Sequence, residues 1–152
     1  MAVGFEWRGE LIGTIRAVPM QFGLTLVEKL LGPDITLPPG ALKHSWELSR
    51  LVIDPGCRAG PDLLRCCLHL GLSFLSSHAP VGNLFGACTP PLARLYQRFG
   101  YEVVARNVPL PGHPRTYWLV HGPMARVMAA VSGAHPQKIS TTTIQKENHH
   151  GP

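Results

Sequence analysis

Residues 45–53 read SWELSRLVI, a strand pattern that carries polar side chains. Alternation predicts one face made of Trp46, Leu48, Arg50 and Val52 and another made of Glu47, Ser49, Leu51 and Ile53. Neither face is wholly apolar, so the polar side chains are expected at a sheet end or in a cavity. Glu47 and Arg50 are therefore candidate functional residues.

The residues before this strand predict a hairpin and a short helix. Residues 5–7 and 11–18 read as two strands around a turn at Gly9, with β-branched side chains recurring along the second strand. We expect a helix over residues 22–31 that ends at Gly32-Pro33, followed by a Pro/Gly-rich loop over residues 37–40.

The residues after it alternate between helices and strands. Helices are expected over residues 63–76, 92–99 and 124–131, and strands over 83–88, 101–108 and 116–120. Pro61 sits where a first helical residue belongs, and Gly100 where a helix ends. The pattern predicts a mixed α/β domain over residues 1–131. Residues 132–152 are polar without periodicity and are expected to form a disordered tail.

Composition sets the class of protein. The chain has 152 residues, of which 45% are hydrophobic and 15% charged, which fits one globular domain. It contains no apolar run of the ~20 residues that a membrane span needs, and its N-terminus lacks the pattern of a signal peptide. We therefore expect a cytoplasmic protein without a membrane span.

Charge favours an acidic partner. The formal net charge is +5, and the section from Arg50 to Arg126 holds eight arginines against three acidic residues. An acidic carrier protein and a phosphate-bearing cofactor fit this charge equally well. No basic run carries interleaved aromatic residues, so nucleic acid is not an expected partner. The cysteines lack metal-ligand spacing, and no metal is expected.

Two stretches resemble a known family. Residues 9–19, GELIGTIRAVP, contain G-x-x-R-x-x-P, and WELSR follows at residues 46–50. This arrangement resembles the acyl-homoserine lactone (autoinducer) synthases. Residues 92–102, LARLYQRFGYE, are similar to the tyrosine-bearing helix of general GNAT acyltransferases. The resemblance implies a GNAT-like N-acyltransferase fold, a mixed central sheet with helices on both faces, from which the family's N-terminal segment is missing.

The same resemblance implies the site residues. Glu47, Arg50 and Tyr96 would be catalytic, and Arg16, Trp46, Leu51, Val52 and Ile53 would bind the substrate. Glu47 would take a proton from the attacking amine, and backbone N–H groups near Leu51–Ile53 would face the thioester oxygen. Arg50 lies three residues after Glu47, so contact between them requires a bulge. Alternatively, both arginines form a structural ion pair with Glu47, and Tyr96 is a core residue on the apolar stripe of its helix.

The cofactor turn departs from the GNAT pattern. Residues 57–62 read CRAGPD where the family has a Q/R-x-x-G-x-G/A turn that binds phosphate. Pro61 removes a donor and Asp62 adds a negative charge. Arg58, Ala59, Gly60 and Arg65 are therefore expected to hold one phosphopantetheine phosphate.

The resemblance also sets the expected reaction. The expected donor is an acyl-carrier protein, with CoA as the other candidate. The expected acceptor is an amino acid or S-adenosylmethionine, as in quorum-sensing autoinducer synthesis. The alternatives are a short-chain GNAT acetyltransferase using acetyl-CoA and an inactive GNAT-like binding module.

Overall fold

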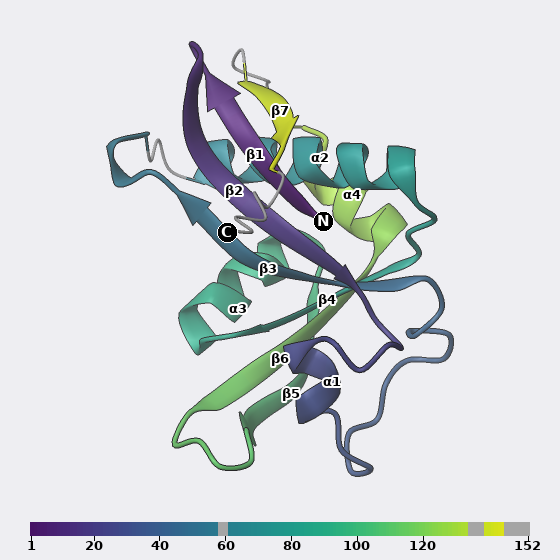
Figure 1. The fold of residues 1–152 in the computed structure, drawn as a ribbon. Coiled ribbons are helices and arrows are strands. Elements are labelled where there is room, and N and C mark those ends of the chain that lie inside the picture. Colours follow the sequence, from purple (N-terminus) through teal and green to yellow (C-terminus); the bar gives the residue numbers. More distant parts are fainter. Residues whose placement is uncertain (58–60, 134–138, 145–152) are drawn as a thin grey trace, which may run out of the picture.

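The computed structural model describes residues 1–57, 61–133 and 139–144 (Figure 1). These residues form β1 (Ala2–Trp7), β2 (Glu10–Pro19), α1 (Leu26–Leu30), β3 (Ser45–Ile53), α2 (Pro61–His78), β4 (Asn83–Cys88), α3 (Pro90–Arg98), β5 (Glu102–Pro109), β6 (Thr116–Pro123), α4 (Met124–Val131) and β7 (Ile139–Thr143). The seven strands form one sheet in the order β5-β6-β4-β3-β2-β1-β7. Neighbouring strands are antiparallel except β3 and β4, which are parallel.

Two hydrophobic clusters show that helices cover both faces of this sheet. Leu84 of β4 and Val120 of β6 lie in a cluster with buried residues of α2 and α4. The next residue of β4, Phe85, lies in a second cluster with Val27 and Leu30 of α1. Because successive strand residues point to opposite faces, α1 lies across the sheet from α2 and α4. The predicted mixed sheet with helices on both faces is confirmed.

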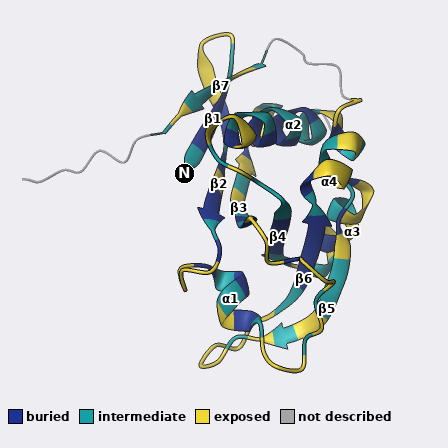
Figure 2. Cartoon of the chain, turned by 90° about the vertical axis from the view of Figure 1, so that its right-hand side faces the viewer, coloured by how far each residue is buried: buried dark blue, intermediate teal, exposed yellow. Residues whose placement is uncertain are grey.

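Burial is greatest in the middle of the molecule. Figure 2 shows the buried residues gathered along α2 and the central strands, with exposed residues in the loops. Gly71 of α2 lets the helix approach the sheet, since a Cβ there would lie 3.3 Å from the Ile15 side chain. Pro61 is the first residue of α2, as its position in the sequence predicted.

Helix α1 starts later than predicted. Thr25, with extended backbone angles, accepts a hydrogen bond from the Glu28 N–H, and the Glu28 carboxylate accepts one from the Thr25 N–H. This capping box fixes the start of the helix at Leu26, whereas the sequence predicted a start at residue 22.

The tail prediction is wrong for residues 139–143. They form β7, which pairs antiparallel with β1 from Val3↔Thr143 to Trp7↔Ile139. The outer edge of β1 supplies hydrogen-bond partners, and the β-branched threonines suit a strand although the stretch has no apolar periodicity. Residues 134–138 and 145–152 of the predicted tail lie outside the described part of the chain.

Candidate acyl-transfer site

The sheet divides between β3 and β4. Their parallel pairing covers Ser45↔Asn83, Trp46↔Leu84 and Glu47↔Phe85, and within the described residues no further pair follows. In Figure 1 the two strands run apart beyond this point. We call the two diverging segments, Leu48–Ile53 of β3 and Gly86–Cys88 of β4, the β3–β4 fork. In the part of the chain that the structure describes, the two strands of the fork therefore do not supply hydrogen-bond partners to each other, as they would in a continuous sheet.

A bulge lies in β3 at the fork. Thr14 pairs with Val52 and Arg16 with Ser49, so Ile15 alone faces both Arg50 and Leu51. Arg50 has φ 50°, in the left-handed region that non-glycine residues rarely adopt. The bulge that a contact between Glu47 and Arg50 would require is therefore present at the expected place. It is a local kink that re-aims the end of the strand.

The bulge changes which side chains share a face. Trp46, Leu48 and Leu51 pack against the cluster that contains α2, and Ile53 belongs to that cluster. Strict alternation had predicted Leu51 and Ile53 on the face of Glu47. That prediction is wrong from Arg50 onward, because one extra residue in the strand shifts the alternation by one.

The bulge also sets the direction of the peptide groups in the fork. The Asp54 N–H donates to the Ile12 carbonyl at 2.7 Å, so this pair is a hydrogen-bonded pair of the β2–β3 ladder. Hydrogen-bonded pairs alternate in an antiparallel ladder, which makes Thr14↔Val52 the next one. The peptide groups of Leu51 and Ile53 therefore point away from β2 and toward the fork.

Glu47 is a buried carboxylate held by helix α1. Its side chain is 6% exposed, and Oε2 accepts a hydrogen bond of 2.7 Å from the Val27 N–H. Burial raises the pKa of Glu47, while the N–H groups of Val27 and Leu26 oppose this rise. The nearby Glu28 carboxylate also raises this pKa, and Arg16 lowers it. The hydrogen bond between Glu47 and α1 could not be predicted from the sequence, because it joins residues twenty positions apart.

Arg16 lies on β2, the strand beside Glu47, and Arg50 lies on β3 itself, three residues after Glu47. Glu47 is paired with Val18, and Ser49 with Arg16, so Arg16 is the diagonal neighbour of Glu47 on the same face. Both Arg16 and Arg50 are exposed. In the described part of the chain the recorded ion pair is Arg126–Glu102, at 3.1 Å. Glu47 is therefore satisfied by backbone N–H groups, and both guanidinium groups face solvent.

Tyr96 lies on α3, the helix that follows the end of β4. Its ring contacts that of Tyr101 with centroids 5.2 Å apart, and both tyrosines pack in the α2-side cluster. Burial, followed by the nearby Cys88 thiol, raises the pKa of Tyr96 to about 12. The phenol therefore keeps its proton at neutral pH and can act as a hydrogen-bond donor.

The remaining predicted residues are dispersed. Trp46 donates from Nε1 to the Pro80 carbonyl at 3.3 Å, which ties β3 to the loop before β4. Arg65 is half-buried on α2, and its Nε atom is buried without a hydrogen-bond partner. Arg58, Ala59 and Gly60 lie outside the described residues. Within the described ranges, no group of three or more potential metal ligands occurs, and no helix is long and apolar enough to span a membrane.

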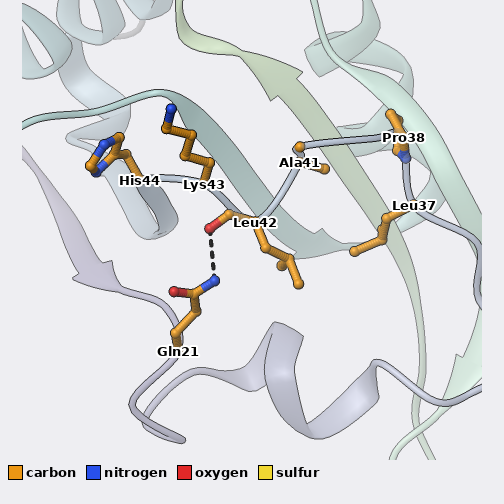
Figure 3. A pocket seen from close by; sticks show the side chains of 8 residues that line it. Gln21, Leu37, Pro38, Ala41, Leu42, Lys43 and His44 are labelled. Carbon is orange, nitrogen blue, oxygen red and sulfur yellow. Dashed lines mark hydrogen bonds between the residues drawn. The ribbon is translucent and has the colours of Figure 1, made fainter.

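A separate pocket lies at the opposite end of β3. It has a volume of about 550 Å³ and is lined by Gln21, Leu37, Pro38, Gly40, Ala41, Leu42, Lys43 and His44 (Figure 3). None of the predicted site residues lines it. The Gln21 side chain donates to the Leu42 carbonyl at 2.9 Å, which joins the two walls. The sequence indicated only a Pro/Gly-rich loop here.

A network of hydrogen bonds stabilises the wall of this pocket. The Asn83 amide donates to the carbonyls of Gly40 and Lys43, at 3.1 and 2.7 Å. Its Oδ1 atom lies 2.8 Å from Nε2 of the buried His121. Because the amide nitrogen is committed to two carbonyls, the imidazole Nε2 must donate, and in the neutral ring Nδ1 is then the unprotonated nitrogen. Burial, then Arg126, lowers the pKa of His121, against a smaller opposite effect of Glu102.

Comparison with known proteins identifies the fold. No protein-family model matches the chain, and no significantly similar sequence was found among curated proteins. Among solved structures, the AHL synthase LasI matches 87% of this chain and 68% of its own, with 18% identity and a TM-score of 0.58.

Two further structures agree. TofI in its apo form matches 86% of this chain and 70% of its own at 23% identity, with a TM-score of 0.58. Aminoglycoside 6'-acetyltransferase type Ii matches 81% and 68%, respectively, at 19% identity, with a TM-score of 0.52. The chain therefore has the GNAT fold of the N-acyltransferases and resembles the AHL synthases in structure.

Proposed function

We propose that the chain is an N-acyltransferase that moves an acyl group from a carrier thioester to the amine of a small acceptor at the β3–β4 fork. One observation carries the proposal: parallel pairing ends at Glu47↔Phe85, and the bulge then turns the peptide groups of Leu51 and Ile53 toward the fork. A thioester carbonyl placed there would meet N–H donors fixed by the sheet. The AHL synthase and acetyltransferase neighbours support this assignment of activity.

In the proposed reaction the acceptor nitrogen attacks the thioester carbonyl carbon. A C–N bond forms, the C–S bond breaks, and the nitrogen loses a proton. Glu47 takes this proton, directly or through a water, because a carboxylate with a raised pKa is a better base. The exposed guanidinium groups of Arg16 and Arg50 would bind the carboxylate of an amino-acid-like acceptor.

Tyr96 is assigned to the leaving sulfur. A phenol with a pKa of about 12 is a weaker acid than a thiol, whose pKa is about 8.5, so complete transfer of its proton to the thiolate is uphill. We therefore propose that Tyr96 donates a hydrogen bond to the sulfur and that solvent supplies the proton. Trp46 and Val52 would complete the walls of the site.

An acyl-carrier protein is the proposed donor. Arg94 and Arg98 are exposed on α3, and Arg65 lies on α2 with a buried Nε–H group that has no hydrogen-bond partner. These cations would meet an acidic carrier, and Arg65 would reach the phosphopantetheine phosphate together with residues 58–60. The acceptor is proposed to be S-adenosylmethionine or an amino acid. The solved structure of TofI in a ternary complex with an inhibitor and MTA supports the first of these choices.

A thiol-release assay tests this function. Acyl-carrier proteins loaded with different acyl chains, and acetyl-CoA, would be mixed with the chain and with S-adenosylmethionine or amino acids. Mass spectrometry would identify the product. We expect thiol release that requires both an acyl-carrier thioester and an amine. Release with acetyl-CoA and an amine, but not with any acyl-carrier protein, would instead indicate a short-chain acetyltransferase. If the folded protein released thiol from none of the donors, it would be a binding module.

A charge reversal tests the donor assignment. Arg94→Glu with Arg98→Glu should raise KM for the acyl-carrier protein by roughly 10-fold or more, because each reversal replaces attraction by repulsion at the docking surface. The matched control is Arg8→Glu in the β1–β2 turn, far along the sheet from α3. An equal effect of the control and the α3 variants would contradict the docking surface.

A further inference from the structure

Among the described residues, strand β7 forms one edge of the sheet. The Ile144 N–H donates to the Ala2 carbonyl at 3.1 Å, so this pair is hydrogen-bonded across β1 and β7. The alternation of antiparallel pairs makes Gly4↔Thr142 and Glu6↔Ser140 hydrogen-bonded as well. The peptide groups of Ile139, Thr141 and Thr143 therefore point outward, away from β1.

The two edge strands of the sheet differ in how well they are protected against pairing with strands of other chains. The β5 edge contains charged residues, ends at Pro109, has Asn107 at φ 50°, and has two register shifts against β6. Such features are the usual means by which edge strands avoid pairing with other chains. The β7 edge, by contrast, reads ISTTTI over residues 139–144, with no charge, proline or glycine. Its register with β1 is unbroken over five pairs.

The outward groups of β7 match a second copy of themselves. A two-fold axis through Thr141 would pair Thr141 with Thr141 and Ile139 with Thr143 of the other chain. All three outward residues would then form hydrogen-bonded pairs, with no donor or acceptor left over. The facing side chains would be β-branched pairs, which stabilise neighbouring strands.

We propose that two copies of this chain pair through antiparallel β7 strands about an axis at Thr141, so that the two sheets become continuous. This interface is distant from the β3–β4 fork, because β2 and β1 lie between β3 and β7. The proposal is independent of acyl transfer, and either can fail without the other.

Sedimentation equilibrium of the full chain tests the association. We expect a species of twice the 16.6 kDa chain mass at high protein concentration. Thr141→Pro should shift the species to the single-chain mass, because proline removes the outward N–H without removing a bond to β1. Thr141→Val, which keeps the N–H group, should associate like the parent chain. A parent chain that stays at 16.6 kDa at all concentrations would overturn the proposal.

Cysteine cross-linking tests the register and does not depend on the fold of the proline variant. Thr141→Cys places one thiol beside its own copy at the axis, so mild oxidation should give a covalent dimer. Thr142→Cys faces Ser140 of the other chain in this register and should not cross-link above the background of the parent chain, in which Cys57 is half-buried. Equal cross-linking at both positions, or none at residue 141, would overturn the proposed axis.

Discussion

At the scale of single residues, Glu47 has both a structural and a proposed chemical role. Its carboxylate holds the first turn of α1 through the N–H groups of Val27 and Leu26, and it is almost fully buried. The sequence indicated a polar residue inside a hydrophobic strand, which was enough to select it. Its partner could not be predicted, because the contact with α1 depends on how the chain folds back after β2.

Glu47→Gln separates the two roles. The glutamine oxygen can still accept the Val27 N–H, so the fold should be retained, whereas the neutral amide cannot act as a base. We expect turnover of the acyl-carrier thioester to fall by roughly 10²–10⁴-fold. Glu10→Gln, on an exposed position of β2, is the matched control. If Glu47→Gln matched the parent rate, Glu47 would be a structural anchor only.

The pH dependence of stability provides a second test of Glu47. Because its pKa is raised in the folded state, the folded chain binds this proton more tightly than the unfolded chain. The associated stability is present below the ordinary carboxyl pKa of about 4.3 and is lost as the pH rises through the raised value. From acidic to neutral pH, the free energy of unfolding of the parent chain should therefore decrease relative to that of Glu47→Gln. Urea titrations at several pH values measure this difference, and a constant or opposite difference would contradict it.

At the scale of elements, the bulge in β3 decides the geometry of the fork. It turns Leu51 and Ile53 toward the α2-side core and leaves Arg50 exposed in the left-handed region. The backbone and the guanidinium group of Arg50 can thus be studied apart, since glycine favours the same φ without a side chain.

Arg50→Gly should keep the bulge and remove the cation. We expect the melting temperature to stay the same or rise, because glycine relieves the left-handed strain. In contrast, kcat/KM for the acceptor should fall by about 10-fold or more, as charge-assisted hydrogen bonds contribute ~1.5–3 kcal/mol. Arg50→Val, with its β-branched side chain, should lose stability as well. Thermal unfolding and acceptor titrations measure both effects, and parent-like kinetics of Arg50→Gly would exclude Arg50 from acceptor binding.

Elements with strong periodic patterns could be predicted with their bounds, as for β3, β4 and α4. The prediction from the sequence was wrong where a local contact overrides the hydrophobic pattern. The Thr25–Glu28 capping box delays α1, and the β3 bulge reverses the alternation that a regular strand would have. Strand β7 was not predicted, because its residues form a strand only by pairing with the edge of β1.

At the scale of the whole molecule, the order of the strands positions the site. The parallel β3–β4 step in the middle of a largely antiparallel sheet is where the strands part, with α3 following directly at the end of β4. The motifs of residues 9–19 and 46–50 indicated this fold correctly. The convergence of Arg16, Glu47 and Arg50 on one substrate remains a prediction, because their placement on neighbouring strands does not reveal what they bind.

Acyl transfer at the β3–β4 fork requires that a thioester binds there. An isotope-labelled chain would be titrated with a non-hydrolysable acyl-pantetheine thioether, and backbone amide chemical shifts would be followed by NMR. We expect the largest changes at the fork, in Leu48–Ile53 of β3 and Gly86–Cys88 of β4. Changes confined to the pocket walls at residues 37–44, or no changes at saturating analogue, would contradict it.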